Sequence, residues 1–182
     1  MMEFLELAKE RFSVRKFKEV SIAQEYIDKI LEAGSIAPTA CNRQPQKILV
    51  INSKEGIENF KKCTECHFNA PLAFVISYDK EQCWSRSYDG KTSGEIDASI
   101  VATHMMLEAT ELGIGSTWVM YFIPEAIKVE FEFPNNLEPV AVLVMGYQIE
   151  GPRPAVEHLE PKKLNEMIMY NSYNKNISKH KK

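Results

Sequence analysis

The feature that most limits the fold of this chain is a helix-length stretch, residues 92–112, that is apolar almost all round. Thr92 and Glu95 form a capping-box pattern at its start, and two glycines follow its end. Such a helix is buried on most sides, either by its own chain or by a partner, and it suits the core of a dimer. Its apolar residues are Ala98, Ile100, Val101, Ala102, Met105, Met106, Leu107, Ala109 and Leu112.

Apolar runs around this helix predict strands. Residues 47–52, 72–78 and 137–147 are nearly continuous in apolar residues, which is typical of strands covered on both faces, and residues 116–122 resemble a fourth strand. Shorter amphipathic helices are predicted between them. These lie at 2–10, at 21–33 with Gly34 as the residue after its end, at 53–62 and at 124–132.

Composition limits the class of protein. With 182 residues, of which 45% are hydrophobic, the chain suits one domain or one protomer of an intertwined dimer. A net charge of −3 disfavours general binding to nucleic acid or to anionic membranes. No apolar run approaches the roughly 18 residues of a membrane span, and the N-terminus lacks the pattern of a signal peptide. We therefore expect a cytoplasmic protein whose four cysteines are reduced.

A compact cationic motif lies near the N-terminus. In an extended segment Arg11, Ser13 and Arg15 point the same way, because side chains alternate between faces. Two guanidinium groups and a hydroxyl on one face suit a phosphate or a polyol, while Phe12 and its apolar neighbours would anchor the segment to the core. Taken alone, the motif is more typical of a solvated basic patch.

A second candidate is the loop at residues 37–46. Two prolines exclude regular structure, and small residues allow close approach of the backbone to a ligand. The amides of Asn42 and Gln44 offer the donors and acceptors that the edge of a heteroaromatic ring needs. They could equally bond their own backbone in an ordinary loop.

Four motifs together resemble the nitroreductase family. Arg-Phe-Ser-Val-Arg-Lys-Phe at 11–17 is similar to its opening Arg-x-Ser-x-Arg-x-Phe, and residues 37–45 resemble its Ala-Pro-Ser-(Ala/Ser)-x-Asn-x-Gln-Pro loop. Leu-Gly-Ile-Gly-Ser-Thr-Trp at 112–118 and the strand ending at Tyr147 resemble two later segments. The resemblance implies an α+β fold with a mixed central sheet flanked by helices, in an intertwined homodimer that binds FMN at its interface.

The resemblance also implies which residues bind FMN. By motif, the first segment would hold the phosphate, the ribityl chain and the N1/O2 edge of the ring, and a fixed cation there favours reduced flavin. The 37–45 loop would contact the ring, partly from the second subunit, and the segment after Gly115 would lie against its face or N5 edge. The predicted cofactor-binding residues are Arg11, Phe12, Ser13, Arg15, Pro38, Thr39, Ala40, Asn42, Ser116, Thr117, Trp118 and Met120.

One basic residue of the family pattern has no clear match. The family places an Arg or Lys after the late strand to complete the phosphate site. Here Lys162, Lys163 and Arg153 are all candidates, of which we take Lys162. We predict a single domain over residues 1–182, in which 152–182 form an extended C-terminal arm with one short helix at 164–170. This proline- and lysine-containing arm either wraps a partner subunit or stays mobile.

A rival signal is Cys63-Thr64-Glu65-Cys66-His67, which matches the C-x-x-C-H pattern of haem attachment. Because the pair closes a helix and precedes a strand, it has the reverse context of a thioredoxin-type motif. A zinc site would need further ligands, for which Cys83 could serve with His67. Ordinary thiols remain the favoured interpretation, and we predict no metal.

The sequence therefore predicts an FMN-dependent NAD(P)H oxidoreductase. It would pass hydride through flavin N5 by a ping-pong mechanism to a flat, electron-poor acceptor such as a nitroaromatic or a quinone. No side chain is predicted to be catalytic, since the cofactor supplies the chemistry. The alternatives are a flavin-binding module without turnover and a thiol or metal redox protein built on Cys63 and Cys66. Neither the acceptor nor the choice between NADH and NADPH follows from the sequence.

Overall fold

The structure is a computed structural model that describes residues 3–151 and 154–173. The chain divides into two compact units, a first unit, Met1–Pro152, and a second unit, Arg153–Lys182. The first unit contains a four-stranded antiparallel sheet in the order β1-β2-β4-β3. Its strands are β1 (Gln46–Ile51), β2 (Leu72–Asp79), β3 (Gly115–Val119) and β4 (Leu137–Gly146).

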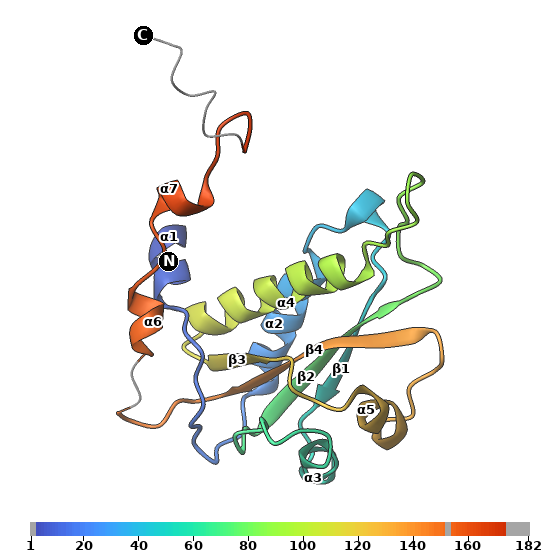
Figure 1. The fold of residues 1–182 in the computed structure, drawn as a ribbon. Helices are drawn as coiled ribbons and strands as arrows, with labels where there is room; N and C mark the ends of the chain where they lie inside the picture. Colours follow the sequence, from blue (N-terminus) through green and yellow to red (C-terminus); the bar gives the residue numbers. More distant parts are fainter. Residues whose placement is uncertain (1–2, 152–153, 174–182) are drawn as a thin grey trace. The chain divides into compact units, whose positions relative to one another are not determined.

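Helices cover both faces of this sheet (Figure 1). On one face lie α2 (Gln24–Ser35) and α4 (Gly94–Glu111), and on the other lie α3 (Lys54–Lys61) and α5 (Pro124–Glu130). Phe74 and Ile76 of β2 point into the first layer, whereas Ala73 and Val75 point into the second. The strand needs apolar residues at every position because both of its faces are buried. The predicted α+β class is confirmed.

The apolar helix is the core element that its sequence predicted. α4 packs on α2, and side chains along its length are buried within the first unit. Gly34, predicted to follow the end of α2, instead lies inside that helix. A Cβ there would come within 2.9 Å of Met105 Cγ, so the glycine lets the two helices approach closely. The predicted capping box at Thr92 is also wrong, because Ser93 is the N-cap residue and its side chain does not cap the helix.

The N-terminal segment lies against β3, one of the two edge strands of the sheet. After α1 (Phe4–Glu10), Ser13 forms a parallel bridge with Ser116 of β3, and this bridge adds a parallel pairing to the antiparallel sheet. Further on, the Lys18 amide donates to the Tyr147 carbonyl at 2.7 Å, and Phe17 forms an antiparallel bridge with Gln148. The segment is therefore an ordered part of the fold and not a loose basic patch.

The second unit contains two short helices, α6 (Val156–Leu159) and α7 (Leu164–Met167). The sequence predicted one helix over 164–170 and an extended path before it, so α6 is an addition to the prediction and α7 is shorter than predicted. Lys162 and Lys163 lie between the two helices and are exposed. Arg153, the third candidate for the phosphate site, lies outside the described residues. Within the described residues, none of the helices combines the length and apolar content that crossing a membrane requires.

Candidate cofactor site

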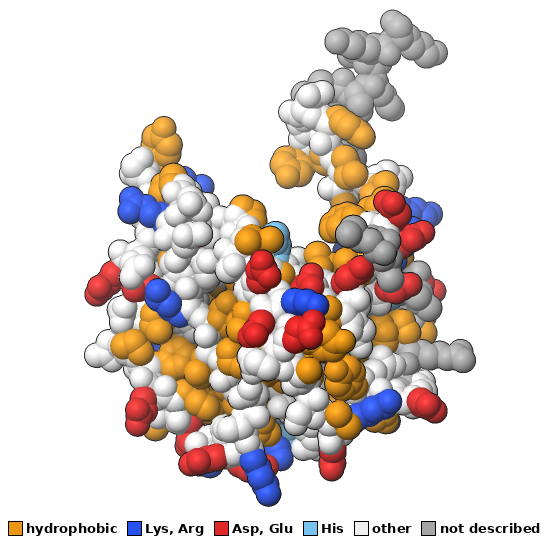
Figure 2. Space-filling model, turned by 180° about the vertical axis from the view of Figure 1, so that it is seen from behind, with side chains coloured by type: hydrophobic (Ala, Val, Ile, Leu, Met, Phe, Trp, Pro, Cys, Tyr) orange, Lys and Arg blue, Asp and Glu red, His pale blue; other side chains and the backbone are white. Residues whose placement is uncertain are grey.

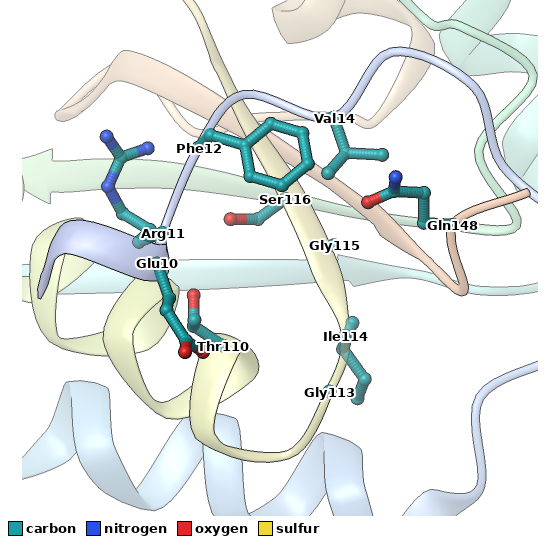
Figure 3. Close-up of a pocket in the computed structure, with 10 residues that line it drawn as sticks. All are labelled: Glu10, Arg11, Phe12, Val14, Thr110, Gly113, Ile114, Gly115, Ser116 and Gln148. Atoms are coloured by element: carbon teal, nitrogen blue, oxygen red, sulfur yellow. The ribbon is translucent and has the colours of Figure 1, made fainter. Parts of the chain in front are cut away.

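A small cavity lies where the N-terminal segment meets β3 and the end of α4. Its volume is about 160 Å³. Arg11 stands at one side of it, with Phe12 above the strand and the Ser116 side chain beneath (Figure 3). The lining residues are Glu10, Arg11, Phe12, Val14, Thr110, Gly113, Ile114, Gly115, Ser116 and Gln148.

Hydrogen bonds to backbone groups hold the N-terminal segment against β3. The Val14 amide donates to the Ser116 carbonyl at 3.0 Å, and the Thr117 hydroxyl donates to the Val14 carbonyl. Val14 is buried, and Gly115 gives it room, because a Cβ at that glycine would lie 2.8 Å from Val14 Cγ2. The glycine and the threonine of the Gly-Ser-Thr-Trp motif therefore serve to hold the N-terminal segment against the strand.

Arg11 and Ser116 both bring polar groups to this cavity that have no partner within the described residues. In the part of the chain that the structure describes, the guanidinium of Arg11 makes no hydrogen bond or ion pair. The hydroxyl of Ser116 is buried and has no partner either. Buried polar groups are normally satisfied, and a hydroxyl and a cation that both lack partners in one cavity would suit an oxygen-rich anion. These residues fit a flavin phosphate or ribityl group.

The other predicted residues of the two segments lie outside this cavity. Ser13 is half-buried and Arg15 is exposed. Trp118 is half-buried and packs against the layer that contains α4, and Met120, just after β3, is 62% exposed. The Thr117 hydroxyl donates its proton to the Val14 carbonyl, so this side chain can only accept a hydrogen bond from a ligand.

The 38–42 loop forms a tight turn at the opposite end of α4. It contains the short 3-10 helix η1 (Ala40–Asn42), and Cys41 and Asn42 both have a positive φ of 51°. Non-glycine residues rarely adopt this conformation, and it is often found at functional sites. Pro38 and Asn42 are exposed, while Thr39 and Ala40 are half-buried.

Within one chain the two predicted halves of the site do not meet. The Ala40 amide contacts Asp97 in the first turn of α4, whereas Arg11 shares its cavity with Thr110 in the last turn. Thirteen residues of helix separate those two contacts, a span of about 20 Å at 1.5 Å per residue. The structure therefore brings Arg11, Phe12 and Ser116 together and leaves the turn at 38–42 at the other end of α4 (Figure 1).

Asp97 was missed by the sequence reasoning. It is 2% exposed, and its Oδ1 accepts a hydrogen bond from the Ala40 amide at 2.9 Å. A signal was present, since Asp97 shares the i, i+4 spacing of Val101, Met105 and Ala109 and so lies on the buried stripe of the helix. A carboxylate on such a stripe requires a hydrogen-bonding partner.

The C-x-x-C-H segment does not have the surroundings of a reactive site. Cys63 is fully buried, and burial raises the pKa of its thiol, which disfavours the thiolate. Burial also lowers the pKa of His67. Cys83 follows the far end of β2, so it cannot join His67, which precedes that strand. In residues 3–151 and 154–173, no three His, Cys, Asp or Glu side chains are grouped to hold a metal ion.

Comparison with known proteins identifies the family. The model of the nitroreductase family matches residues 8–68 and 63–147. The chain belongs to the nitroreductase family. A Methanothermobacter thermautotrophicus protein described as an NADH dehydrogenase/NAD(P)H nitroreductase is 30% identical over 162 residues, which cover 83% of this chain and 80% of that protein. The predicted family is thus confirmed.

Solved structures of the nitroreductase family share the fold. A nitroreductase family protein from Clostridium difficile 630 superposes with a TM-score of 0.89 at 44% identity, covering 94% of this chain and 99% of that one. An FMN-dependent nitroreductase from Clostridium difficile R20291 gives a TM-score of 0.76 at 29% identity, covering 93% and 100%. The motifs predicted FMN as the cofactor, and the name of this second structure contains the same cofactor.

The cysteine pair provides a test of the thiol alternative. We expect the double variant Cys63→Ser/Cys66→Ser to keep the flavin content and the NAD(P)H oxidation rate of the parent, since neither thiol lies in the cavity. A loss of stability of about 1 kcal/mol is compatible with placing a hydroxyl at the buried Cys63 position. Flavin content and steady-state rates measure the outcome, and a colourless or inactive but folded variant would restore the thiol redox protein as the better interpretation.

Proposed function

We propose that this nitroreductase-family chain is an FMN-dependent oxidoreductase that uses NADH or NADPH to reduce a flat, electron-poor aromatic acceptor. The observation that carries the proposal is the Arg11 cavity, which is lined both by an unpaired guanidinium and by Ser116, whose buried hydroxyl has no partner. Relatives named as NAD(P)H nitroreductases and as an FMN-dependent nitroreductase support it. The redox chemistry is supplied by the bound cofactor, which carries a hydride between NAD(P)H and the acceptor.

The residues of this chain bind and orient the cofactor. Arg11 and Ser116 would hold an anionic or polyol part of FMN, with Ser13 and Arg15 beside them on the same segment. Lys162 remains a candidate for completing the phosphate site from the C-terminal arm, residues 152–182. The turn at Pro38–Asn42 and the exposed backbone near Met120 would contact the ring. We retain the proposal that no side chain is catalytic, because the cofactor supplies the chemistry.

We further propose that the site is completed by a second copy of the chain in a homodimer. A cavity of about 160 Å³ is smaller than the roughly 300–1,000 Å³ of typical small-molecule pockets. A two-fold axis that places α4 against its symmetry mate would bring the 38–42 turn of one copy to the Arg11 cavity of the other. Such a dimer would cover Ile96 of α4, a large apolar side chain that is exposed in one copy. Figure 2 shows that the surface seen from behind carries apolar side chains between interspersed acidic and basic ones.

The test uses the full chain reconstituted with FMN. We expect a yellow dimer in gel filtration with light scattering, which bleaches when NADH or NADPH is added without oxygen and regains colour when a nitroaromatic or a quinone follows. A yellow protein that NAD(P)H does not bleach would favour a flavin-binding module without turnover. A monomer that stays colourless with excess FMN would contradict the proposal.

A further inference from the structure

A buried hydrogen-bond cluster at the start of α4 ties together two segments that are far apart in the sequence. Asp97 Oδ1 accepts from the Ala40 amide at 2.9 Å, and its Oδ2 accepts from the Ser93 hydroxyl at 2.7 Å. The Ser93 amide in turn donates to the Trp84 carbonyl at 2.9 Å. One carboxylate thus connects the turn at 38–42 to the segment that begins at Trp84.

The segment from Trp84 to Thr92 is an ordered hairpin. Ser85 and Thr92 form an antiparallel bridge at its base, and the Arg86 amide donates to the Lys91 carbonyl at 2.9 Å. Near the tip, the Arg86 guanidinium forms two hydrogen bonds to the Asp89 carboxylate. This framework presents the Tyr88 side chain, which is 94% exposed. A tyrosine held outward by an ordered hairpin can stack on a flat ligand.

The Asp97 carboxylate is buried, and both of its oxygens have hydrogen-bond partners. Asp97 is 2% exposed, and the first turn of a helix favours a negative charge. Its two oxygens each accept one hydrogen bond, from the Ala40 backbone and from the Ser93 side chain. The strained turn at Cys41 and Asn42 is held to the core through the first of these bonds. Removal of the carboxylate would free the turn and would take one hydrogen bond from Ser93, the residue that joins α4 to the hairpin base.

We propose that Asp97 is a positioning residue that holds the turn Thr39–Asn42 and the hairpin Trp84–Thr92 as one unit, so that cofactor binding and acceptor selection depend on the same carboxylate. The inference rests on the proposed function, in which the turn contacts the FMN ring. The hairpin then lies beside the ring site and offers Tyr88 as an aromatic contact for the acceptor.

The test compares variants of the full-length chain in FMN titrations. Asp97→Ala should weaken FMN binding about tenfold or more, because two hydrogen bonds to a charged group are lost. Asp97→Asn keeps an oxygen for the Ala40 amide and should recover most of that affinity. Glu95→Ala, which removes an exposed carboxylate from the same helix turn, is the matched control and should bind FMN as the parent does.

Two further measurements separate positioning from simple loss of stability. The visible circular dichroism of bound FMN should change in Asp97→Ala, because the ring loses its fixed contact, and the KM for a nitroaromatic acceptor should rise more than kcat falls. Ser93→Ala removes only one bond, so it should stay folded and show the same changes at smaller size. Tyr88→Ala should raise the acceptor KM and leave FMN affinity unchanged.

The outcomes distinguish this inference from the function on which it rests. Parent protein that binds no FMN would overturn the proposed function. Parent protein that binds FMN, with Ser93→Ala and Asp97→Ala matching it in FMN affinity, dichroism and acceptor KM, would overturn only the role of Asp97. An Asp97→Asn variant as weak as Asp97→Ala would also overturn the role, since the positioned oxygen would then not matter.

Discussion

Arg11→Ala is expected to lower the affinity for FMN about 10- to 150-fold while the protein stays folded. The guanidinium lies in the cavity, half-buried and without a partner in the described residues, so nothing in the fold depends on it. A hydrogen bond to a charged group contributes about 1.5–3 kcal/mol to binding, which corresponds to that range of affinity. Fluorescence titration with FMN measures the loss, and thermal unfolding of the apoprotein should change little.

Two control variants sharpen this result. Arg11→Lys keeps the charge but loses the planar fork, so its FMN affinity should fall between those of the parent and Arg11→Ala. Lys54→Ala removes one exposed positive charge from α3, on the opposite face of the sheet, and should leave the affinity unchanged. If Arg11→Ala retained FMN through gel filtration as firmly as the parent, the assignment of this residue to the cofactor site would be wrong.

The same variant tests the shared site. Arg11→Ala and Asn42→Ala would each damage both sites of a homodimer, but they would damage them from different subunits. In a mixed dimer, one site then carries both substitutions and the other carries neither. We expect co-refolded mixtures to regain tight binding of about one FMN for each mixed dimer, a stoichiometry that complementation between subunits requires. Mixtures that bind no better than the separate variants would show that Arg11 and Asn42 belong to the same subunit's site.

The pattern of apolar residues predicted the strands and the helical layers that cover them. The family motifs predicted which segments would bind the cofactor. The apolar run of β2 is buried at all its positions, as a strand between two helical layers must be. The position of Gly34 could not be predicted in this way, because a glycine that ends a helix and one that lets two helices approach look alike in the sequence. A similar ambiguity affected the start of α4, where two adjacent hydroxyl residues, Thr92 and Ser93, compete for the N-cap role.

The sequence predicted which segments form the candidate site, and the structure shows which residues of those segments line the cavity. The motif at 11–17 indicated a cationic segment, but only the structure shows that Arg11 reaches the cavity and Arg15 does not. Ser116 was named with Thr117 as a cofactor residue, yet the two differ: one hydroxyl is orphaned, and the other bonds the backbone of Val14. Such assignments depend on contacts between residues about a hundred positions apart, which residue spacing alone cannot supply.

Gly115→Ala is expected to destabilise the protein by about 1–3 kcal/mol, the usual cost of adding a methyl group to a packed site. The new Cβ would lie 2.8 Å from Val14 Cγ2 and 3.0 Å from Val14 Cβ and Cγ1. Val14 cannot move freely, because it is 3% exposed and its amide bonds the Ser116 carbonyl. The segment that carries Arg11 must therefore shift, and FMN affinity should fall together with stability. Urea unfolding of the apoprotein and FMN titration measure the two effects.

A double-mutant cycle with Val14→Ala tests this steric explanation. Val14→Ala alone removes buried methyl groups and should destabilise the fold, but in the Gly115→Ala background it also removes the atom nearest to the new Cβ. The double variant should therefore be less destabilised than the sum of the single variants, with a coupling of about 0.5–3 kcal/mol as found for residues in contact. If the two effects add within error, Gly115 is required for a reason other than the close packing of Val14, and the N-terminal segment is not held to β3 by this contact.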